Sequence, residues 1–179
     1  MRVVKLYTFL AFLAISLVSC EKATDENVVF YSKDDLKNEL SVNINDTDGS
    51  LVSVNSTTIV SLNSSDFFKK NIAYLRNVDV PKMYFKVKNF NANSSNSISN
   101  VEVFIDEIRI TDDMGVNFLN TTNNNVAFEI DNEELLSAIG SKLMQKKQVT
   151  ISYYSDAITV NPMDFGFEFS ITAHGTFVD

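Results

Sequence analysis

The last part of the chain carries a strict alternation of apolar and polar residues. Between positions 163 and 177, apolar side chains occupy nearly every odd position, and polar or charged ones occupy most of the even positions. A period of two is typical of a β-strand that buries one face, because successive side chains of a strand point to opposite faces. The run exceeds the usual strand length, so we expect a bend or β-bulge near Gly166 or Gly175. The apolar positions are Met163, Phe165, Phe167, Phe169, Ile171, Ala173 and Phe177.

Shorter versions of this pattern recur along the rest of the chain. Segments rich in Asn and Ser separate them, and these residues favour turns. Several alternating strands joined by polar turns indicate a mainly β fold, an antiparallel β-sandwich with one or two peripheral helices. The alternating segments centre on Val42, Val60, Phe85, Val103 and Ile151, and runs at 28–31, 52–54 and 126–130 add further strands.

One amphipathic helix is predicted over 132–146. Asp131 is its expected N-cap, and Glu134 stands where a capping box places its acidic partner. The lysines near its end leave a cationic helix on a membrane surface as the alternative to a helix packed on the core. The acidic start and the short length favour the core. The apolar face consists of Leu135, Leu136, Ile139 and Leu143.

A second, shorter helix is expected from Phe67 to Arg76. Asp66 precedes it as a candidate N-cap, and Phe68, Ile72 and Leu75 are spaced four and three residues apart. This spacing places the three apolar side chains on one face of a helix.

Composition removes several kinds of chemistry. The 179 residues include one Cys and one His and no Trp, which excludes an internal disulfide, a Cys-based metal cage and a His-rich metal site. A net charge of -8 argues against a protein that follows phosphate backbones. The glycines form no phosphate-binding motif. We therefore expect neither a cofactor nor a nucleic-acid partner.

The first twenty residues have the layout of an export signal. Arg2 and Lys5 precede an uncharged run of 13 residues, which ends at Val18 and is followed by Ser19 and Cys20. The run is shorter than the ~20 apolar residues that span a bilayer as a helix. Leu17-Val18-Ser19-Cys20 resembles the lipobox of bacterial lipoproteins.

This resemblance implies a division of the chain and a location. Residues 1–19 would be a signal peptide that is removed, and acylated Cys20 would hold the protein to the membrane. Residues 20–26 would form a lipidated tether, and 27–179 would form a single β-sandwich domain, similar to other β-sandwich envelope lipoproteins. The expected location is the bacterial cell envelope, anchored in the outer membrane, with the periplasmic and the surface face both open.

Four residues are candidates for ligand binding. Lys86 and Lys88 share one face of a predicted strand with Tyr84, which makes a small basic and aromatic strip. The competing interpretation is cross-strand charge pairing with Glu102 and Asp106 on the strand that follows. Tyr153 and Tyr154 are adjacent on one predicted strand, so we expect one of the two rings to be exposed on the sheet surface. Tyr154 is the fourth candidate.

Catalysis and metal binding find weaker support. His174 could form a triad with a Ser of the same strand and with Asp164 or Glu168, but residues of one strand face lie in a row and do not converge. Asp46 and Asp48 resemble half of an EF-hand loop, whose first and last ligands are lacking. A looser calcium site, which would include Asp112 and Asp113, stays open.

The sequence therefore predicts a lipid-anchored envelope protein that binds or supports a partner and is not an enzyme. A carbohydrate- or small-ligand-binding accessory lipoprotein is the alternative, and a hydrolase is the least supported reading. The partner would be an envelope protein or a glycan. The long polar segment Asn91–Asn100 is the expected binding region, because long loops on rigid scaffolds often carry function.

Overall fold

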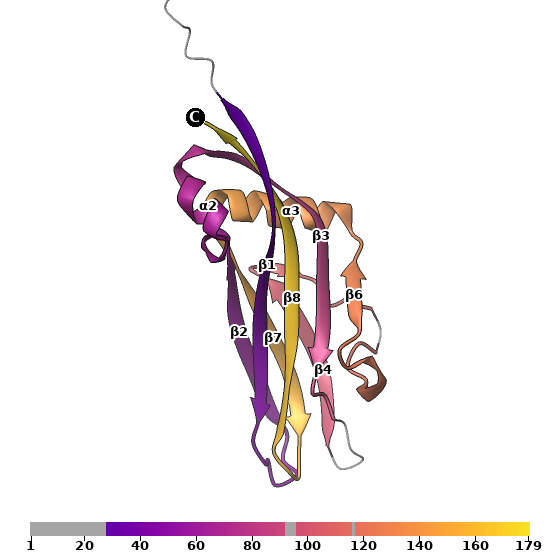
Figure 1. Cartoon of the computed structure of the whole chain (residues 1–179). Helices are drawn as coiled ribbons and strands as arrows, with labels where there is room; N and C mark the ends of the chain where they lie inside the picture. Colours follow the sequence, from indigo (N-terminus) through magenta and orange to yellow (C-terminus); the bar gives the residue numbers. More distant parts are fainter. Residues whose placement is uncertain (1–27, 92–95, 116) are drawn as a thin grey trace, which may run out of the picture.

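The computed structural model describes residues 28–91, 96–115 and 117–179 and shows a β-sandwich (Figure 1). All strand pairs of its two four-stranded sheets are antiparallel. The β8 sheet has the order β1 (Val29–Ile44), β8 (Met163–Val178), β3 (Leu75–Lys88) and β6 (Ala127–Ile130). The β7 sheet has the order β2 (Val52–Ser61), β7 (Gln148–Ile158), β4 (Ser97–Ile105) and β5 (Ile108–Arg109). The predicted fold class is confirmed.

The core is built from the alternating positions of the long strands. On β8, every apolar residue of the C-terminal alternation is buried, and the pattern continues on β1, β3 and β7. Phenylalanine rings form much of the contact: the Phe167 ring lies 5.5 Å from the ring of Tyr153 on the opposite sheet, and Phe85 lies 5.2 Å from Phe128. Burial of these faces is the main favourable contribution to the fold.

The irregularity predicted near Gly175 lies in the neighbouring strand β3, and β8 itself carries no β-bulge against β1. β8 pairs with β1 without interruption from Val29↔Val178 to Ile44↔Met163. Register shifts occur instead in β3, one of them between Asp79 and Lys82. Gly175 serves packing, because a Cβ atom there would lie 2.7 Å from a ring carbon of Phe68.

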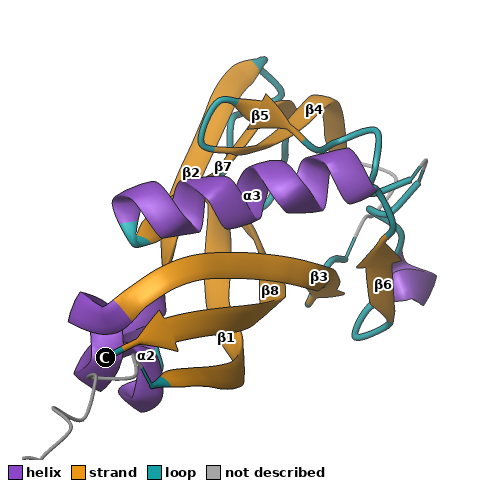
Figure 2. Cartoon of the chain, turned by 90° about the horizontal axis from the view of Figure 1, so that it is seen from above, coloured by secondary structure: helices purple, strands orange, loops and turns teal. Residues whose placement is uncertain are grey.

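Helix α3 (Glu133–Lys146) confirms the predicted helix and its buried face. Leu135, Ile139 and Leu143 are buried, and the helix packs chiefly on β3 (Figure 2). At Gly140, a Cβ would lie 2.9 Å from the Val78 carbonyl oxygen, so only glycine permits this close approach.

The predicted N-cap of α3 was one residue early. Asn132, not Asp131, accepts a hydrogen bond from the Leu135 amide at 3.1 Å. Both residues are good caps. Ile130 ends the buried face of β6, and the helix begins after the two residues that follow it.

Helix α2 (Asp66–Asn71) is shorter than predicted. Ser65, rather than Asp66, caps it by accepting from the Phe68 amide at 3.3 Å. A 3₁₀ turn (Ile72–Tyr74) follows, and Leu75 already begins β3 opposite Phe177. Pairing with β8 overrides the local helical pattern at Leu75 and Arg76.

The edges of the two sheets meet along one side of the sandwich, at β1 and β2. There the Asn38 side-chain amide donates to the Ile59 carbonyl, and the Ser56 hydroxyl donates to the Ser41 carbonyl, each at 2.5 Å. These bonds satisfy edge carbonyls that would otherwise be open to pairing with another chain.

The sandwich has two distinct ends (Figure 1). The upper end holds the start of β1, α2 and the C-terminus, where the Asp179 amide donates to the Val28 carbonyl at 3.1 Å. The lower end holds the β1–β2 and β7–β8 connections, and the Thr47 amide donates to the Thr159 carbonyl at 3.1 Å. Sixteen residues of β8 separate the ends by roughly 50 Å at the usual rise per residue of a strand.

One polar group in the core, the Tyr153 hydroxyl, should make the protein less stable at alkaline pH. Tyr153 is fully buried between the sheets. Neither its hydroxyl nor that of Ser155 forms a hydrogen bond of good geometry with a described residue. Burial raises the pKa of Tyr153 to about 12, and the Ser155 hydroxyl opposes that shift only in part.

We expect Tyr153→Phe to remove this dependence. In the wild type, the tyrosine of the unfolded chain ionises near pH 10 while the buried one stays neutral, so stability falls as pH rises from about 10 to 12, by about 2.7 kcal/mol in all. Urea unfolding should show that Tyr153→Phe loses less free energy of unfolding between pH 8 and pH 11 than the wild type does. At pH 8 the two proteins should be about equally stable. Tyr154→Phe is the matched control, since that ring is exposed. Equal losses in wild type and Tyr153→Phe would contradict the assignment.

Candidate functional site

The lysine strip on β3 is occupied by ion pairs. Lys88 Nζ lies 2.7 Å from Glu168 Oε2 on β8 and 3.1 Å from Glu39 Oε2 on β1. Lys86 Nζ lies 3.6 Å from Glu168. The hydrogen bond with Glu168 raises the pKa of Lys88, and the same bond lowers the pKa of Glu168. These lysines are therefore neutralised on the exposed face of the β8 sheet.

The predicted pairing partners of the strip were wrong. β4 belongs to the other sheet, so β6 and β8 flank β3 instead. Glu102 lies 3.5 Å from Arg109, and Asp106 lies 3.1 Å from Lys146. The chain crosses from one sheet to the other between β3 and β4, which a local pattern does not reveal.

The four candidate binding residues do not form one site. Tyr84, Lys86 and Lys88 alternate with buried residues on β3 and so point outward from the β8 sheet. Tyr154 is 45% exposed on the outer face of the β7 sheet, with the Phe104 ring 5.9 Å away. The expectation that one tyrosine of the pair is exposed is confirmed. Because the outer faces of a sandwich point in opposite directions, no single ligand spans the four residues.

His174 lies in a shallow depression near the upper end. It stands opposite Lys33 on β1 and Asp79 on β3, and the depression of about 460 Å³ also includes Ser32. Its Nε2 atom has no hydrogen-bond partner among the described residues. Ser32 pairs with Gly175 instead, so its side chain points to the face opposite that of His174. A hydrogen-bonded Ser–His pair is not formed here.

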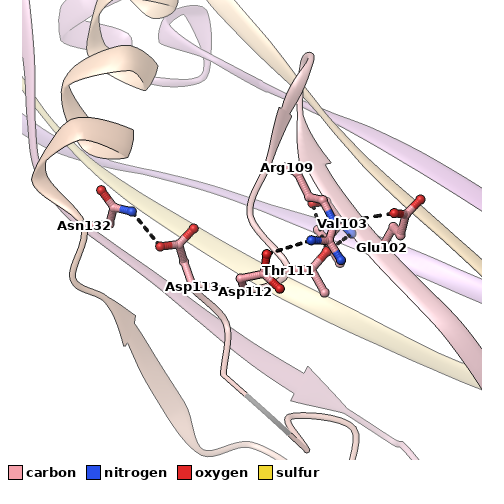
Figure 3. A network of polar contacts seen from close by, with 7 residues as sticks. All are labelled: Glu102, Val103, Arg109, Thr111, Asp112, Asp113 and Asn132. Carbon is pink, nitrogen blue, oxygen red and sulfur yellow. Dashed lines mark hydrogen bonds and ion pairs between the residues drawn. The ribbon is translucent and has the colours of Figure 1, made fainter.

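The acids considered for a looser calcium site are engaged in other contacts. Asp112 binds Arg109 at 2.7 Å, and Asp113 accepts from the side-chain amide of Asn132 at 2.7 Å; Figure 3 shows both contacts. In the same network, the Thr111 hydroxyl accepts from the Val103 amide, which ties the turn after β5 to β4.

Asp46 accepts from the Asp48 amide at 2.8 Å, in the β1–β2 connection at the lower end, away from α3. Within the described ranges, no group of three or more His, Cys, Asp or Glu side chains is arranged to hold a metal ion.

A groove of about 460 Å³ with mainly apolar lining lies in the lower half of the sandwich, between the end of β3, the start of β4 and the segment after β5 (Figure 1). We call it the lower groove. Its floor is formed by Phe90 and Phe118, which are 5% and 7% exposed. Half-buried Ile98, Val101 and Leu119 form its walls. Polar residues at the rim are Asn96, Ser97 and Asn117.

The groove floor is continuous with the rigid aromatic core. The Phe90 ring meets Phe165 edge to face at 5.3 Å, and Phe118 contacts both Phe85 and Phe167 at 6.0 Å. Edge-to-face packing of this kind fixes ring orientation. The floor is therefore preformed, as expected of a binding site.

Asparagine side chains shape the walls of the groove. Asn124 accepts from the Phe90 amide at 2.9 Å and donates to the Phe90 carbonyl at 2.7 Å, as a neighbouring strand would. The Asn123 side chain donates to the Asn117 carbonyl at 3.1 Å. Asn89 and Asn117 have positive φ angles, which Asn adopts more readily than most residues. The Asn-rich segments are therefore partly a structural framework.

The lining of the groove suits an apolar ligand group. None of the described residues that line it is an acid, a base or a cysteine. Its volume lies within the ~300–1,000 Å³ range of small-ligand sites. Sequence patterns missed its floor and walls, although Phe118 and Leu119 are the apolar residues of 117–125, where the others are Asn and Thr. That isolation is the signal that could have indicated them.

The predicted binding segment Asn91–Asn100 needs a correction at its end. β4 begins at Ser97, and Ser99 pairs with Asp156, so the last residues belong to the sheet. Asn96 accepts from the Val160 amide at 3.2 Å. Residues 92–95 lie outside the described part of the chain, as does Cys20, the predicted lipidation site.

Comparisons with known proteins add little. No family model matches the sequence, and no curated protein does. A solved structure of decameric BFDV capsid protein is 8% identical with a TM-score of 0.44, and the match covers 82% of this chain and 99% of that one. Desmodium yellow mottle tymovirus gives 10% identity and a TM-score of 0.31, over 88% and 91% of the two chains. At these values the likenesses carry no functional argument.

No helix within the described residues is long and apolar enough to span a bilayer.

Proposed function

We propose that this chain is a lipid-anchored protein of the bacterial cell envelope that binds a partner without catalysis. Acylated Cys20 is the anchor, and the lower groove is the binding site. The observation that carries the proposal is the placement of the groove. β1 begins at the upper end of the sandwich. Phe90 follows the end of β3, and Asn96 precedes the start of β4, and both of these strand ends lie in the lower half. An anchor at the start of β1 would therefore hold the groove away from the bilayer.

The chemistry of the groove selects its occupant. An apolar side chain or short apolar segment of an envelope protein would bury against Phe90 and Phe118, while the rim residues Asn96 and Asn117 offer hydrogen bonds. A glycan usually requires an exposed aromatic platform with several polar partners, and the groove aromatics lie on a buried floor. We therefore favour a protein partner over the glycan or small-ligand alternative.

Site-specific photo-cross-linking in cells tests this assignment. A benzoylphenylalanine replacing Leu119 should give a protein adduct. The same group replacing Phe104, which is also half-buried but lies on the outer face of the β7 sheet beside Tyr154, should not. Adding Ile98→Asp should abolish the Leu119 adduct, because a charge in an apolar groove opposes binding. Equal adducts from both positions, or none from Leu119, would contradict a binding role for the groove.

A further inference from the structure

The upper end gathers exposed apolar side chains where a folded domain normally has few. Val28 and Val29 are 62% and 48% exposed, Phe67 is 38% exposed and Tyr74 is 41% exposed. They belong to the start of β1 and to the segment from α2 into β3. Tyr31, which is 76% exposed, follows on β1.

Aromatic contacts join the start of β1 and α2 to the end of β8. The Phe30 ring stacks on Phe177 at 5.1 Å, and the Phe67 ring meets Phe177 edge to face at 5.4 Å. Tyr74 directly precedes Leu75, which pairs with Phe177. The exposed residues therefore belong to the segments around Phe177, with Val29 on the sheet face opposite to Phe30 because successive residues of a strand alternate. We call this surface the upper patch, and its residues are Val28, Val29, Phe67 and Tyr74.

Basic residues stand beside the upper patch. Lys69 and Lys70 are exposed in the last turn of α2, and Arg76 is exposed at the start of β3. None of the three forms an ion pair with a described residue. Asp66 of the same helix and Asp179, whose amide donates to the Val28 carbonyl, are acids at this end.

The length of the chain before β1 limits what can cover the upper patch. Seven residues, 21–27, separate Cys20 from Val28. Even fully extended they reach no more than about 25 Å. If Cys20 carries the lipid anchor, the upper patch cannot leave the vicinity of the bilayer surface.

We propose that the upper patch docks on the phospholipid surface of the membrane that holds the anchor. Phe67 and Tyr74 enter the interfacial region together with the two valines, while Lys69 and Lys70 contact anionic phosphate groups. Aromatic rings at the headgroup level, combined with basic residues, are the usual components of interfacial binding. This inference rests on the proposed lipid anchor and adds an orientation: the sandwich stands on its upper end.

The absence of tryptophan from the sequence permits a direct test. Phe67→Trp places a single fluorophore in the upper patch, and Tyr154→Trp places one on the outer face of the β7 sheet at similar exposure. The acylated full chain of each variant is reconstituted into vesicles of phosphatidylethanolamine and phosphatidylglycerol that contain a brominated phospholipid. Tyr74→Trp serves as a second probe if Phe67→Trp does not fold.

Docking predicts that bromolipid lowers the emission of Phe67→Trp about twofold or more and leaves Tyr154→Trp unchanged. Vesicle flotation is measured on the same samples. Variants that float but show no quenching at Phe67 or Tyr74 would leave the anchor intact and overturn docking. Equal quenching at Tyr154 would overturn the proposed orientation. Failure of the wild-type protein to float would overturn the anchor, and docking with it.

Discussion

The Ile139→Asp variant should lose about 3 kcal/mol or more of its free energy of unfolding, the largest stability effect expected here. Ile139 is fully buried on the face of α3 that packs on β3. A carboxylate at this position would lack a partner in an apolar site. Folded domains are stable by only about 5–15 kcal/mol, so a large part of the total would be lost.

Urea unfolding of the mature chain measures the change. Ser137→Asp is the matched control, because Ser137 is exposed on the same helix and should change stability by less than about 0.5 kcal/mol. If Ile139→Asp unfolds like the wild type, α3 is not part of the core. The alternative of a membrane-surface helix would then return.

The structure shows how the lysines of α3 are used. Lys146 Nζ lies 3.1 Å from Asp106, and Lys142 contacts Glu107. The hydrogen bond from Lys142 lowers the pKa of Glu107. Asp106 also accepts from the Thr150 amide at 2.9 Å. These contacts tie α3 to the turn between β4 and β5 and do not present a cationic face to lipid.

Cys20→Ser should abolish membrane attachment, the largest functional effect expected. Thioether acylation requires the sulfur atom, and multiple acyl chains give stable anchoring where a single chain gives only marginal binding. In detergent phase separation, the wild type should enter the detergent phase and Cys20→Ser the aqueous phase. The thermal unfolding midpoint of the mature folded part should not change. Partitioning of Cys20→Ser into detergent would contradict the anchor.

Local periodicity predicted the elements that depend on local sequence. The alternation ending at Phe177 predicted β8, and the spacing of Leu135, Ile139 and Leu143 predicted the buried face of α3. In both elements, the apolar positions of the pattern are the side chains that the fold buries. The exposed ring of Tyr154 followed from the same alternation.

Features set by distant residues were not predictable in this way. Lys88 bridges to Glu39 across β8, which requires the order of three strands separated by long stretches of sequence. The end of α2 is decided by the pairing of Leu75 with Phe177. The choice between Asp131 and Asn132 as cap was locally ambiguous.

The lower groove illustrates the same limit at a binding site. Its residues come from the end of β3, the start of β4 and the segment after β5. No local pattern states that Phe90, Val101 and Phe118 converge. The sequence predicts a binding region at Asn91–Asn100, and Asn96, Ser97 and Ile98 of that segment line the groove.

Mass spectrometry of the N-terminal peptide, taken from the native protein in the membrane fraction, tests the central claim most directly. We expect the chain to begin at Cys20, with a diacylglyceryl group on the sulfur and a further acyl chain on the amine. An unmodified thiol at Cys20, or a chain that retains residues 1–19, would contradict it.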